Sequence, residues 1–420
     1  MTGERAGGHR HRLTAGLLLG IAMGVANVMS YAFMMLLSTT LRAEVYGGFA
    51  ALNSYGVILS IPAGAFQIVV ARRHSAGATG PGHGALTTAA SVGGLIGAAT
   101  IALAPAITAG LHLPSVWAAV WLGLLVPAMT VTGTFQGVLL GRERLGALSL
   151  LYLTTAATRL AAAAVTVVLD LGLAEVFAAM FVAAGVTCLV GAWLCRGLVG
   201  RPDPSGQRFA VLRELMRSNL TLAALITLSS IDVVLARHHL SRQESGDYAL
   251  AALFGRLVFW GTQFVALSIV PAVGEGAGRR TLHRAGLLVL ALGAAVAGIC
   301  SAVPHLLVSF TGGPTYVGAE DLLVWSATLG TLWAVIQVWL FAEMGRDRHT
   351  LSLVTWGAVA AEVALVTLWL HDTPMEVLGA AALSAAAVAL VGAVLVPRGE
   401  PVPAPGSPEV VEAVTADARE

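Results

Sequence analysis

The sequence Gly141-Arg142-Glu143-Arg144 stands at the end of a long apolar run. It recurs as Gly345-Arg346-Asp347-Arg348, again at the end of an apolar run. A charged box at matching points of two hydrophobic halves predicts that the chain arose by duplication of one bundle of helices.

The composition around these boxes is that of a membrane protein. Hydrophobic residues make up 57% of the chain and charged residues 11%, with a mean hydropathy of +0.81; soluble domains average about 45–50% apolar and about 25% charged residues. A membrane-spanning helix needs about 20 apolar residues. Twelve windows qualify and predict twelve helices: 13–37, 47–71, 84–110, 114–140, 147–169, 174–197, 217–239, 247–273, 283–310, 319–342, 350–370 and 375–396.

The positive charges are distributed unevenly between the two sides of the predicted membrane. All 24 basic side chains are arginine. The connections on the outer side hold only Arg42, Arg237 and Arg242, whereas the other side holds nineteen arginines, among them those of both boxes. The positive-inside rule therefore predicts a multi-pass protein with both termini in the cytoplasm. Because the net charge of +1 averages two unlike faces, no nucleic-acid partner is implied.

The predicted spans divide six and six. Residues 200–216 are the longest polar interruption and predict a cytoplasmic linker between an N-terminal lobe (1–199) and a C-terminal lobe (217–397), followed by a disordered cytoplasmic tail (398–420). A shift of 199 residues pairs Gly47 with Gly246 and Gly56 with Gly255, and the boxes pair at a shift of 204. An even number of spans gives both copies one orientation, so we expect a pseudo-two-fold axis along the membrane normal and a central cleft.

Four ionisable side chains fall inside predicted spans, where a charge costs about 2.5–3.5 kcal/mol at the centre of a helix. Counting about 1.5 Å per residue from the outer helix ends places Asp232 about 10 Å deep and Arg256 about 14 Å deep. They form either a structural ion pair or a contact with substrate or a coupling ion. Glu362 is a candidate proton or cation site, a partner of Arg159 across the lobes, or a hydrogen-bonded structural carboxyl.

Arg159 belongs to a polar stripe with Tyr152 and Thr155 on an otherwise Ala- and Leu-rich helix. Its forked donors suit a pyrophosphate; the alternative is an arginine that bonds helix carbonyls inside the lobe. The amides of Asn53 and Gln67 are expected either to line the cleft, where they could bond sugar hydroxyls, or to form hydrogen bonds that hold neighbouring helices together. The same alternatives hold for Asn27, Gln136, Gln263 and Gln337.

Motifs for enzyme chemistry are absent. The sequence has no Walker loop, no clustered metal-ligand spacing and no Gly-x-Ser-x-Gly elbow, so no cofactor or metal is expected. The three cysteines read as small apolar residues. Four histidines, His112, His283, His305 and His371, stand isolated in the sequence and are expected at helix ends.

Several stretches resemble the polysaccharide-type (Wzx-like) flippases of the multidrug/oligosaccharidyl-lipid/polysaccharide exporter superfamily. They are the run from Leu36 to Leu52, the run from Gln136 to Arg144, Ser230 to Arg237 followed by Gly246-Asp247-Tyr248, and Tyr316. The resemblance spans nearly the whole chain. It implies two six-helix lobes in a V that opens alternately to each side and moves a lipid-linked saccharide, with cleft arginines on the anionic head of the lipid carrier.

The hypothesis is a flippase in the bacterial inner membrane for a polyprenyl-pyrophosphate-linked oligosaccharide, with Arg159 and Arg256 on the head group. Membrane lipids and glycan polymerase or glycosyltransferase machinery are the expected partners. The first alternative is a cation-coupled multidrug exporter of the same superfamily, with Asp232 or Glu362 binding the ion. A membrane-embedded glycan polymerase or ligase is the second, but such enzymes tend to use a long outer loop and every predicted outer loop here is short.

Overall fold

The structure is a computed structural model that describes residues 2–75, 82–198, 220–263, 265, 279–344 and 349–395. Within these residues it contains helices and no strand. The chain divides into two compact units, Met1–Leu220 and Thr221–Glu420, called here the N-terminal lobe and the C-terminal lobe. The predicted linker (200–216) and tail (398–420) lie outside the described residues, so the predicted boundaries of these segments stay predictions.

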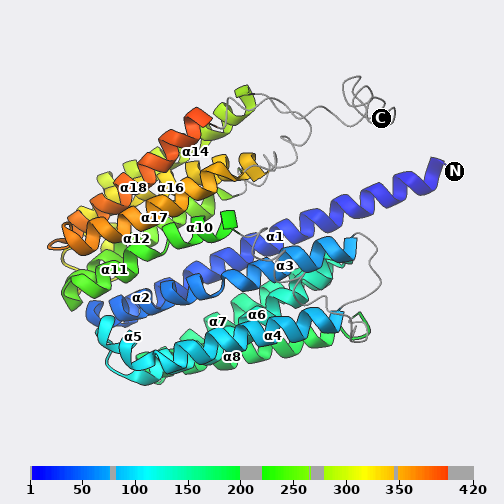
Figure 1. Cartoon of the computed structure of the whole chain (residues 1–420), viewed down its shortest axis with the longest axis horizontal. Coiled ribbons are helices and arrows are strands. Elements are labelled where there is room, and N and C mark those ends of the chain that lie inside the picture. The colour runs from blue at the N-terminus through cyan, green and yellow to red at the C-terminus, as the bar shows by residue number, and fades with distance from the viewer. Residues whose placement is uncertain are drawn as a thin grey trace, which may run out of the picture. The chain divides into compact units, whose positions relative to one another are not determined.

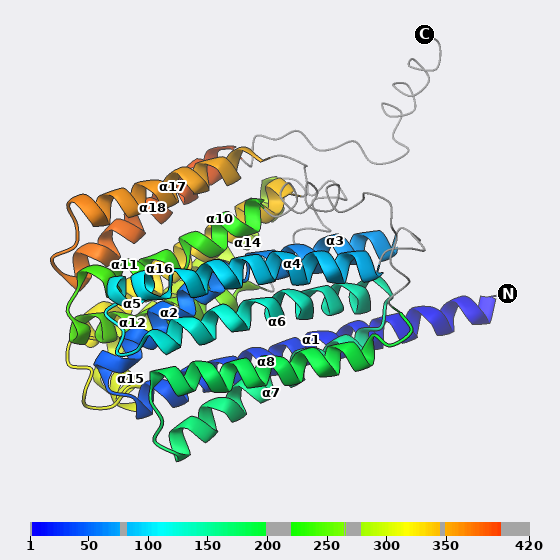
Figure 2. The same cartoon turned by 60° about the horizontal axis from the view of Figure 1, so that its bottom comes forward.

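Long helices run side by side within each lobe (Figures 1 and 2). The N-terminal lobe holds α1 (Thr2–Thr40), α2 (Ala43–Leu59), α3 (Ile61–Ser75), α4 (Gly82–Ala102), α5 (Ala104–Gly110), α6 (Val116–Gly141), α7 (Leu145–Val168) and α8 (Leu173–Leu194). The C-terminal lobe holds α10 (Leu220–Leu228), α11 (Ile231–His239), α12 (Arg242–Gly261), α14 (Arg279–Ala302), α15 (Pro304–Thr311), the short 3-10 helix η1 (Glu320–Leu322), α16 (Leu323–Met344), α17 (Thr350–Leu368) and α18 (Pro374–Leu395).

Eleven helices of the described residues are long and apolar enough to cross a membrane. Each overlaps one of the predicted windows, and two of them are joined pairs, α2 with α3 and α10 with α11. The predicted window 247–273 overlaps α12, but its second half falls largely outside the described residues. The all-helical membrane fold is therefore confirmed, whereas the count of twelve spans stays a prediction.

One central helix organises each lobe. In the N-terminal lobe α6 packs against α3, α4 and α8, and in the C-terminal lobe α16 packs against α12, α14 and α18. The glycines at these contacts correspond between the lobes. Gly56 faces Leu122 as Gly255 faces Ser326, Gly93 faces Pro127 as Gly293 faces Thr331, and Gly191 faces Phe135 as Gly392 faces Trp339. Each partner on α16 follows its counterpart on α6 by the 204 residues that separate the two arginine boxes, so the two lobes repeat one internal packing.

The first arginine box begins with a packing residue. Gly133, Gly137 and Gly141 share one face of α6 and lie against the backbone of α3. A Cβ added at Gly137 would come within 2.6 Å of the carbonyl oxygen of Gln67, and one at Gly141 within 2.6 Å of that of Ala71. Small residues at such a seam let two helix backbones approach closely. The second box lies outside the described residues.

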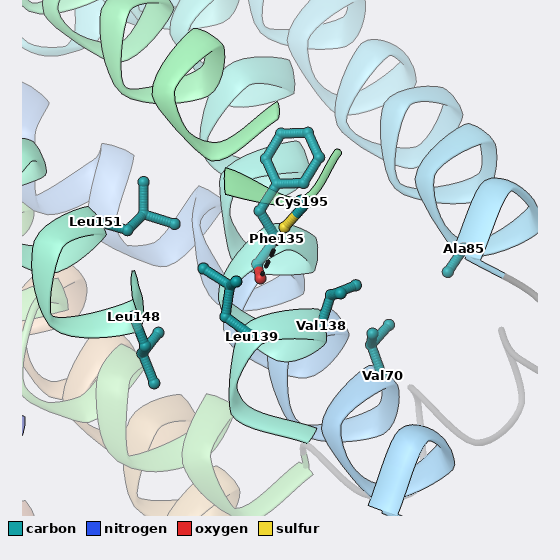
Figure 3. Packing of buried hydrophobic residues seen from close by; sticks show 8 residues of the cluster. All are labelled: Val70, Ala85, Phe135, Val138, Leu139, Leu148, Leu151 and Cys195. Carbon is teal, nitrogen blue, oxygen red and sulfur yellow. Dashed lines mark hydrogen bonds between the residues drawn. The ribbon is translucent and has the colours of Figure 1, made fainter. Parts of the chain in front are cut away.

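The core of the N-terminal lobe continues past this seam. Figure 3 shows apolar side chains of α3, α4, α6 and α7 around the end of α8, where the Cys195 thiol donates to the carbonyl of Phe135 at 3.8 Å. The other members of this cluster are Val70, Ala85, Val138, Leu139, Leu148 and Leu151. Cys188, Cys195 and Cys300 are free cysteines.

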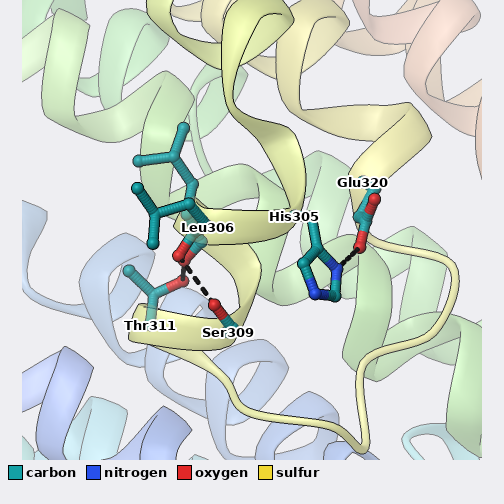
Figure 4. Close-up of polar contacts among 6 residues, drawn as sticks. His305, Leu306, Ser309, Thr311 and Glu320 are labelled. Carbon is teal, nitrogen blue, oxygen red and sulfur yellow. Dashed lines mark hydrogen bonds and ion pairs between the residues drawn. The ribbon is translucent and has the colours of Figure 1, made fainter.

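Polar contacts close one end of the C-terminal lobe. The Nδ1 atom of His305 on α15 donates to Oε1 of Glu320 on η1 at 2.9 Å (Figure 4). The carboxylate of Asp247 on α12 accepts the side-chain amide of Gln243, which also donates to the carbonyl of Thr315 at 2.6 Å. These contacts hold the connection between α15 and α16 against the start of α12. The expectation that His305 is isolated is therefore wrong, because its partner follows fifteen residues later in the chain.

Candidate transport sites within the two lobes

The polar stripe of α7 reaches two other helices of the N-terminal lobe. The side-chain amide of Gln67 on α3 donates to the hydroxyl of Tyr152 at 2.7 Å, and Arg159 Nη2 donates to Oδ1 of Asn53 on α2 at 3.4 Å. Thr155 differs, since its hydroxyl donates to the carbonyl of Leu151 on its own helix. Four of the predicted substrate-contacting residues thus form two side-chain contacts within one lobe.

The guanidinium of Arg159 is only partly satisfied. Its Cζ atom lies 4.9 Å from the centroid of the Phe33 ring on α1, a cation–π distance. Arg159 Nε is buried without a hydrogen-bond partner among the described residues, and no carboxylate of the described part of the N-terminal lobe forms an ion pair with this side chain. The residue as a whole is half-buried. The neighbours of its positive charge in the described part of the lobe are thus one aromatic ring and one side-chain amide.

The Phe33 ring packs against other aromatic rings of the lobe. The rings of Phe33 and Phe49 lie 5.8 Å apart edge to face, and Phe49 in turn lies 5.8 Å from Phe177 on α8. Edge-to-face packing of this kind fixes the rings in place. Phe33 was not among the predicted site residues, because one phenylalanine on an apolar helix carries no signal in sequence that a cation lies above its ring.

The C-terminal lobe buries two carboxylates on two helices that contact each other. Asp232 on α11 is 1% exposed and Glu362 on α17 is 0% exposed. The Tyr248 hydroxyl on α12 donates to Asp232 Oδ2 at 3.0 Å, whereas Asp232 Oδ1 and both oxygens of Glu362 have no hydrogen-bond partner in the described part of the chain. The charges of Asp232 and Glu362 are close enough to act on each other. We call Asp232 and Glu362 the carboxylate pair.

Arg256 lies two turns beyond Tyr248 on α12 and is half-buried. It is close enough for its charge to act on Asp232. The structure thus places Asp232 and Arg256 near each other, as the sequence predicted. It also places Tyr248 and Glu362 beside Asp232, which the sequence did not predict. Whether Arg256 contacts substrate stays a prediction.

Comparison with known proteins gives a result for the fold alone. No protein-family model and no curated protein matches this chain. An inward-facing multidrug resistance MATE family transporter of the MOP superfamily superposes with a TM-score of 0.70 at 16% identity, over 90% of this chain and 96% of the other. The fold is that of the MATE transporters.

Two further solved structures share this MATE-like, two-lobe fold. The lipid II flippase MurJ in an inward closed conformation has a TM-score of 0.67 at 11% identity, over 90% of this chain and 86% of that one. A MOP superfamily transporter from Pyrococcus furiosus, described as having a binding pocket of reverse polarity, has a TM-score of 0.59 at 17% identity, over 91% and 94%. The helical, two-lobe membrane fold predicted from the sequence is therefore confirmed, and solved structures of drug exporters and of a lipid flippase share it.

Proposed function

We propose that this chain is a multi-pass transporter of the bacterial inner membrane that flips a polyprenyl-pyrophosphate-linked oligosaccharide or a similar anionic glycan lipid. The observation that carries the proposal is Arg159, a half-buried residue within a span, which has no acidic partner among the described residues of its own lobe. A charge at this depth is costly. A diphosphate that accepts from its forked donors offsets that cost.

Asn53 and Phe33 orient the guanidinium for such a ligand. Phe33 lies against the cationic plane, and Asn53 accepts from one terminal nitrogen at the long distance of 3.4 Å. A hydrogen bond of that length is weak, so an anion can replace it at little cost. The Gln67 and Tyr152 contact, which joins α3 to α7, supplies neutral hydrogen-bonding groups in the same lobe, suited to sugar hydroxyls.

The energy source in this proposal is a cation or proton bound at the carboxylate pair. Two buried carboxylates with three unpartnered oxygens favour an added positive charge. A change of occupancy at this site alters the electrostatic repulsion between α11 and α17 and so biases the conformation of the C-terminal lobe.

A cation-coupled multidrug exporter is the second candidate function. The carboxylate pair favours it as much as it favours a cation-driven flippase, because both transporters need a site of this kind. The two candidates differ in the charge of the cargo. An anionic lipid needs Arg159, whereas a cationic drug is repelled by it.

The experiment depletes the protein in its host and measures lipid-linked saccharide on the cytoplasmic leaflet. We expect accumulation that wild type relieves, that Arg159→Lys relieves in part, and that Arg159→Gln does not relieve. Arg142→Gln, which removes an exposed guanidinium from the turn after α6, is the matched control and should behave as wild type. Full relief by Arg159→Gln would remove Arg159 from the mechanism, and the absence of accumulation together with drug sensitivity would favour the exporter.

A further inference from the structure

Three histidines from two distant segments meet at one end of the C-terminal lobe. His238 and His239 end α11, and His371 lies in the turn between α17 and α18. The ring centroids of His238 and His239 are 4.6 Å apart, and those of His239 and His371 are 5.0 Å apart. We call these three residues the histidine cluster. The expectation that His371 is isolated is thus wrong, because 132 residues of chain separate it from its neighbour.

The two ring nitrogens of His371 have different neighbours. Its Nδ1 atom lies 2.9 Å from the carbonyl oxygen of Val366, and because a carbonyl only accepts, Nδ1 carries the hydrogen. The neutral ring therefore presents Nε2 as an acceptor, 3.9 Å from Oδ1 of Asp372. A proton added at Nε2 gains a carboxylate neighbour.

The Nε2 atom of His239, unlike that of His371, has no carboxylate neighbour among the described residues. This Nε2 atom is buried and has no hydrogen-bond partner among the described residues. The His239 ring contacts both of the other rings, so a positive charge on His371 would lie next to it. Like charges at 5.0 Å repel in a partly buried setting. Among the described residues, no hydrogen bond of His239 compensates for this repulsion.

The other charged groups nearby have partners elsewhere. The Arg237 guanidinium donates to the Ser245 hydroxyl and to the carbonyl of Arg242. On α12, Glu244 accepts the backbone N–H of Ser241. On α18, Glu376 accepts the backbone N–H of Asp372. These contacts leave Asp372 as the carboxylate that the described residues direct toward the cluster.

We propose that the histidine cluster is a pH-sensitive latch between the end of α11 and the turn that joins α17 to α18. At neutral pH the three rings pack together and hold the two segments against each other. At a pH of about 5.5, in the range where imidazoles gain protons, added positive charge makes neighbouring rings repel each other and the latch opens. The predicted topology puts this end of the lobe on the outer side of the membrane, so the latch responds to external acid.

The latch lies on the two helices that carry the carboxylate pair. Asp232 is seven residues from His239 on α11, and Glu362 is on α17, which leads directly to His371. When the latch opens, α11 and α17 can move relative to each other, and the distance between the two carboxylates can change. This consequence rests on the proposed function of the carboxylate pair, whereas the latch itself does not.

Amide hydrogen exchange of the purified full-length protein in detergent micelles tests the latch at pH 7.5 and pH 5.5. We expect peptides that cover 234–241 and 366–374 to exchange about fivefold faster at the lower pH, after correction for the intrinsic chemical rate. His239→Gln and His371→Gln should each abolish this difference. His305→Gln is the matched control, since it removes an exposed histidine outside the cluster and should keep the difference.

Two results would overturn the latch: no pH-dependent change in wild type, or the same change in both cluster variants. Size-exclusion profiles at pH 7.5 show whether each variant is folded. If a glutamine variant does not fold, His238→Gln provides a second test, because this side chain is exposed and its loss should reduce the pH response without unfolding the lobe. A protein that transports no substrate but retains the exchange response would refute the proposed function and leave the latch standing.

Discussion

Tyr248 joins α12 to the buried Asp232 of α11 through a hydrogen bond of 3.0 Å. The tyrosine occupies one oxygen of the carboxylate and leaves Oδ1 without a partner in the described residues. It therefore fixes the orientation of Asp232 relative to Glu362. The C-terminal lobe holds its buried acids in place through a neutral hydroxyl, which does not cancel their charge.

Tyr248→Phe should destabilise the protein by about 1 kcal/mol, the usual net contribution of a buried hydrogen bond. Chemical denaturation in detergent measures the loss. Tyr55→Phe is the control, because the hydroxyl of that half-buried residue has no hydrogen bond in the described part of the chain. In a double-mutant cycle with Asp232→Asn the two effects should fall short of additivity by at least about 0.5 kcal/mol. Additive effects would show that the hydrogen bond is not formed.

Glu362→Gln should make the protein more stable and less active. The substitution removes a buried carboxyl group that can ionise and whose two oxygens have no partner among the described residues, and we expect a gain of about 1–3 kcal/mol. Transport driven by a proton or sodium gradient should be lost, while exchange between equal substrate pools persists. Thermal unfolding and gradient-driven uptake in vesicles measure the two effects. A destabilised variant that keeps gradient-driven uptake would assign Glu362 a purely structural role.

Gly137→Ala should weaken the seam between α6 and α3. The added methyl group would lie 2.6 Å from the backbone carbonyl oxygen of Gln67, so the helices must separate, at a cost of about 1–3 kcal/mol. Gly146→Ala is the matched control on the exposed side of α7, where nothing lies within 4 Å, and should be neutral or stabilising by up to about 1 kcal/mol. Equal thermal stability of both variants would argue against the close approach of α6 and α3.

Glu343→Ala should destabilise the start of α17. Both carboxylate oxygens of this buried residue accept the backbone N–H of Leu351 at 2.9 Å, and His349 at the N-cap position supplies no side-chain cap. The loss of a helix cap costs about 1–2 kcal/mol. Glu175→Ala, in the exposed first turn of α8, should cost less than about 1 kcal/mol. Faster amide exchange confined to residues 350–354 would locate the effect.

Apolar windows predicted the spans of this chain because the hydropathy of a span depends on local composition. The 204-residue offset between the boxes also matched the packing residues of α6 and α16, since a duplicated helix keeps its contact face. The contacts of the candidate sites were harder to predict. Phe33 beneath Arg159 and His371 beside His239 come from distant segments, and nothing in either segment marks the other as its neighbour.

The role of Gly141 was missed for a related reason. The charges of the box predicted only that it lies on the cytoplasmic side of the membrane. Its glycine, however, packs against Ala71 and His74 of α3. Charge patterns identify the side of a membrane on which a residue lies, but only tertiary packing shows which small residue a backbone contact requires. A four-residue spacing of Gly133, Gly137 and Gly141 was the available signal for this seam.

The most direct test of the proposed function is translocation of a polyprenyl-diphosphate-linked oligosaccharide by the purified protein in vesicles, measured as lipid that becomes accessible to a membrane-impermeant glycan-modifying reagent. We predict transfer well above that of empty vesicles, accelerated by an imposed cation gradient, reduced at least about tenfold by Arg159→Gln, and unchanged by Arg142→Gln. Transfer equal to that of empty vesicles, with uptake of cationic dyes by the same preparation, would contradict the flippase proposal.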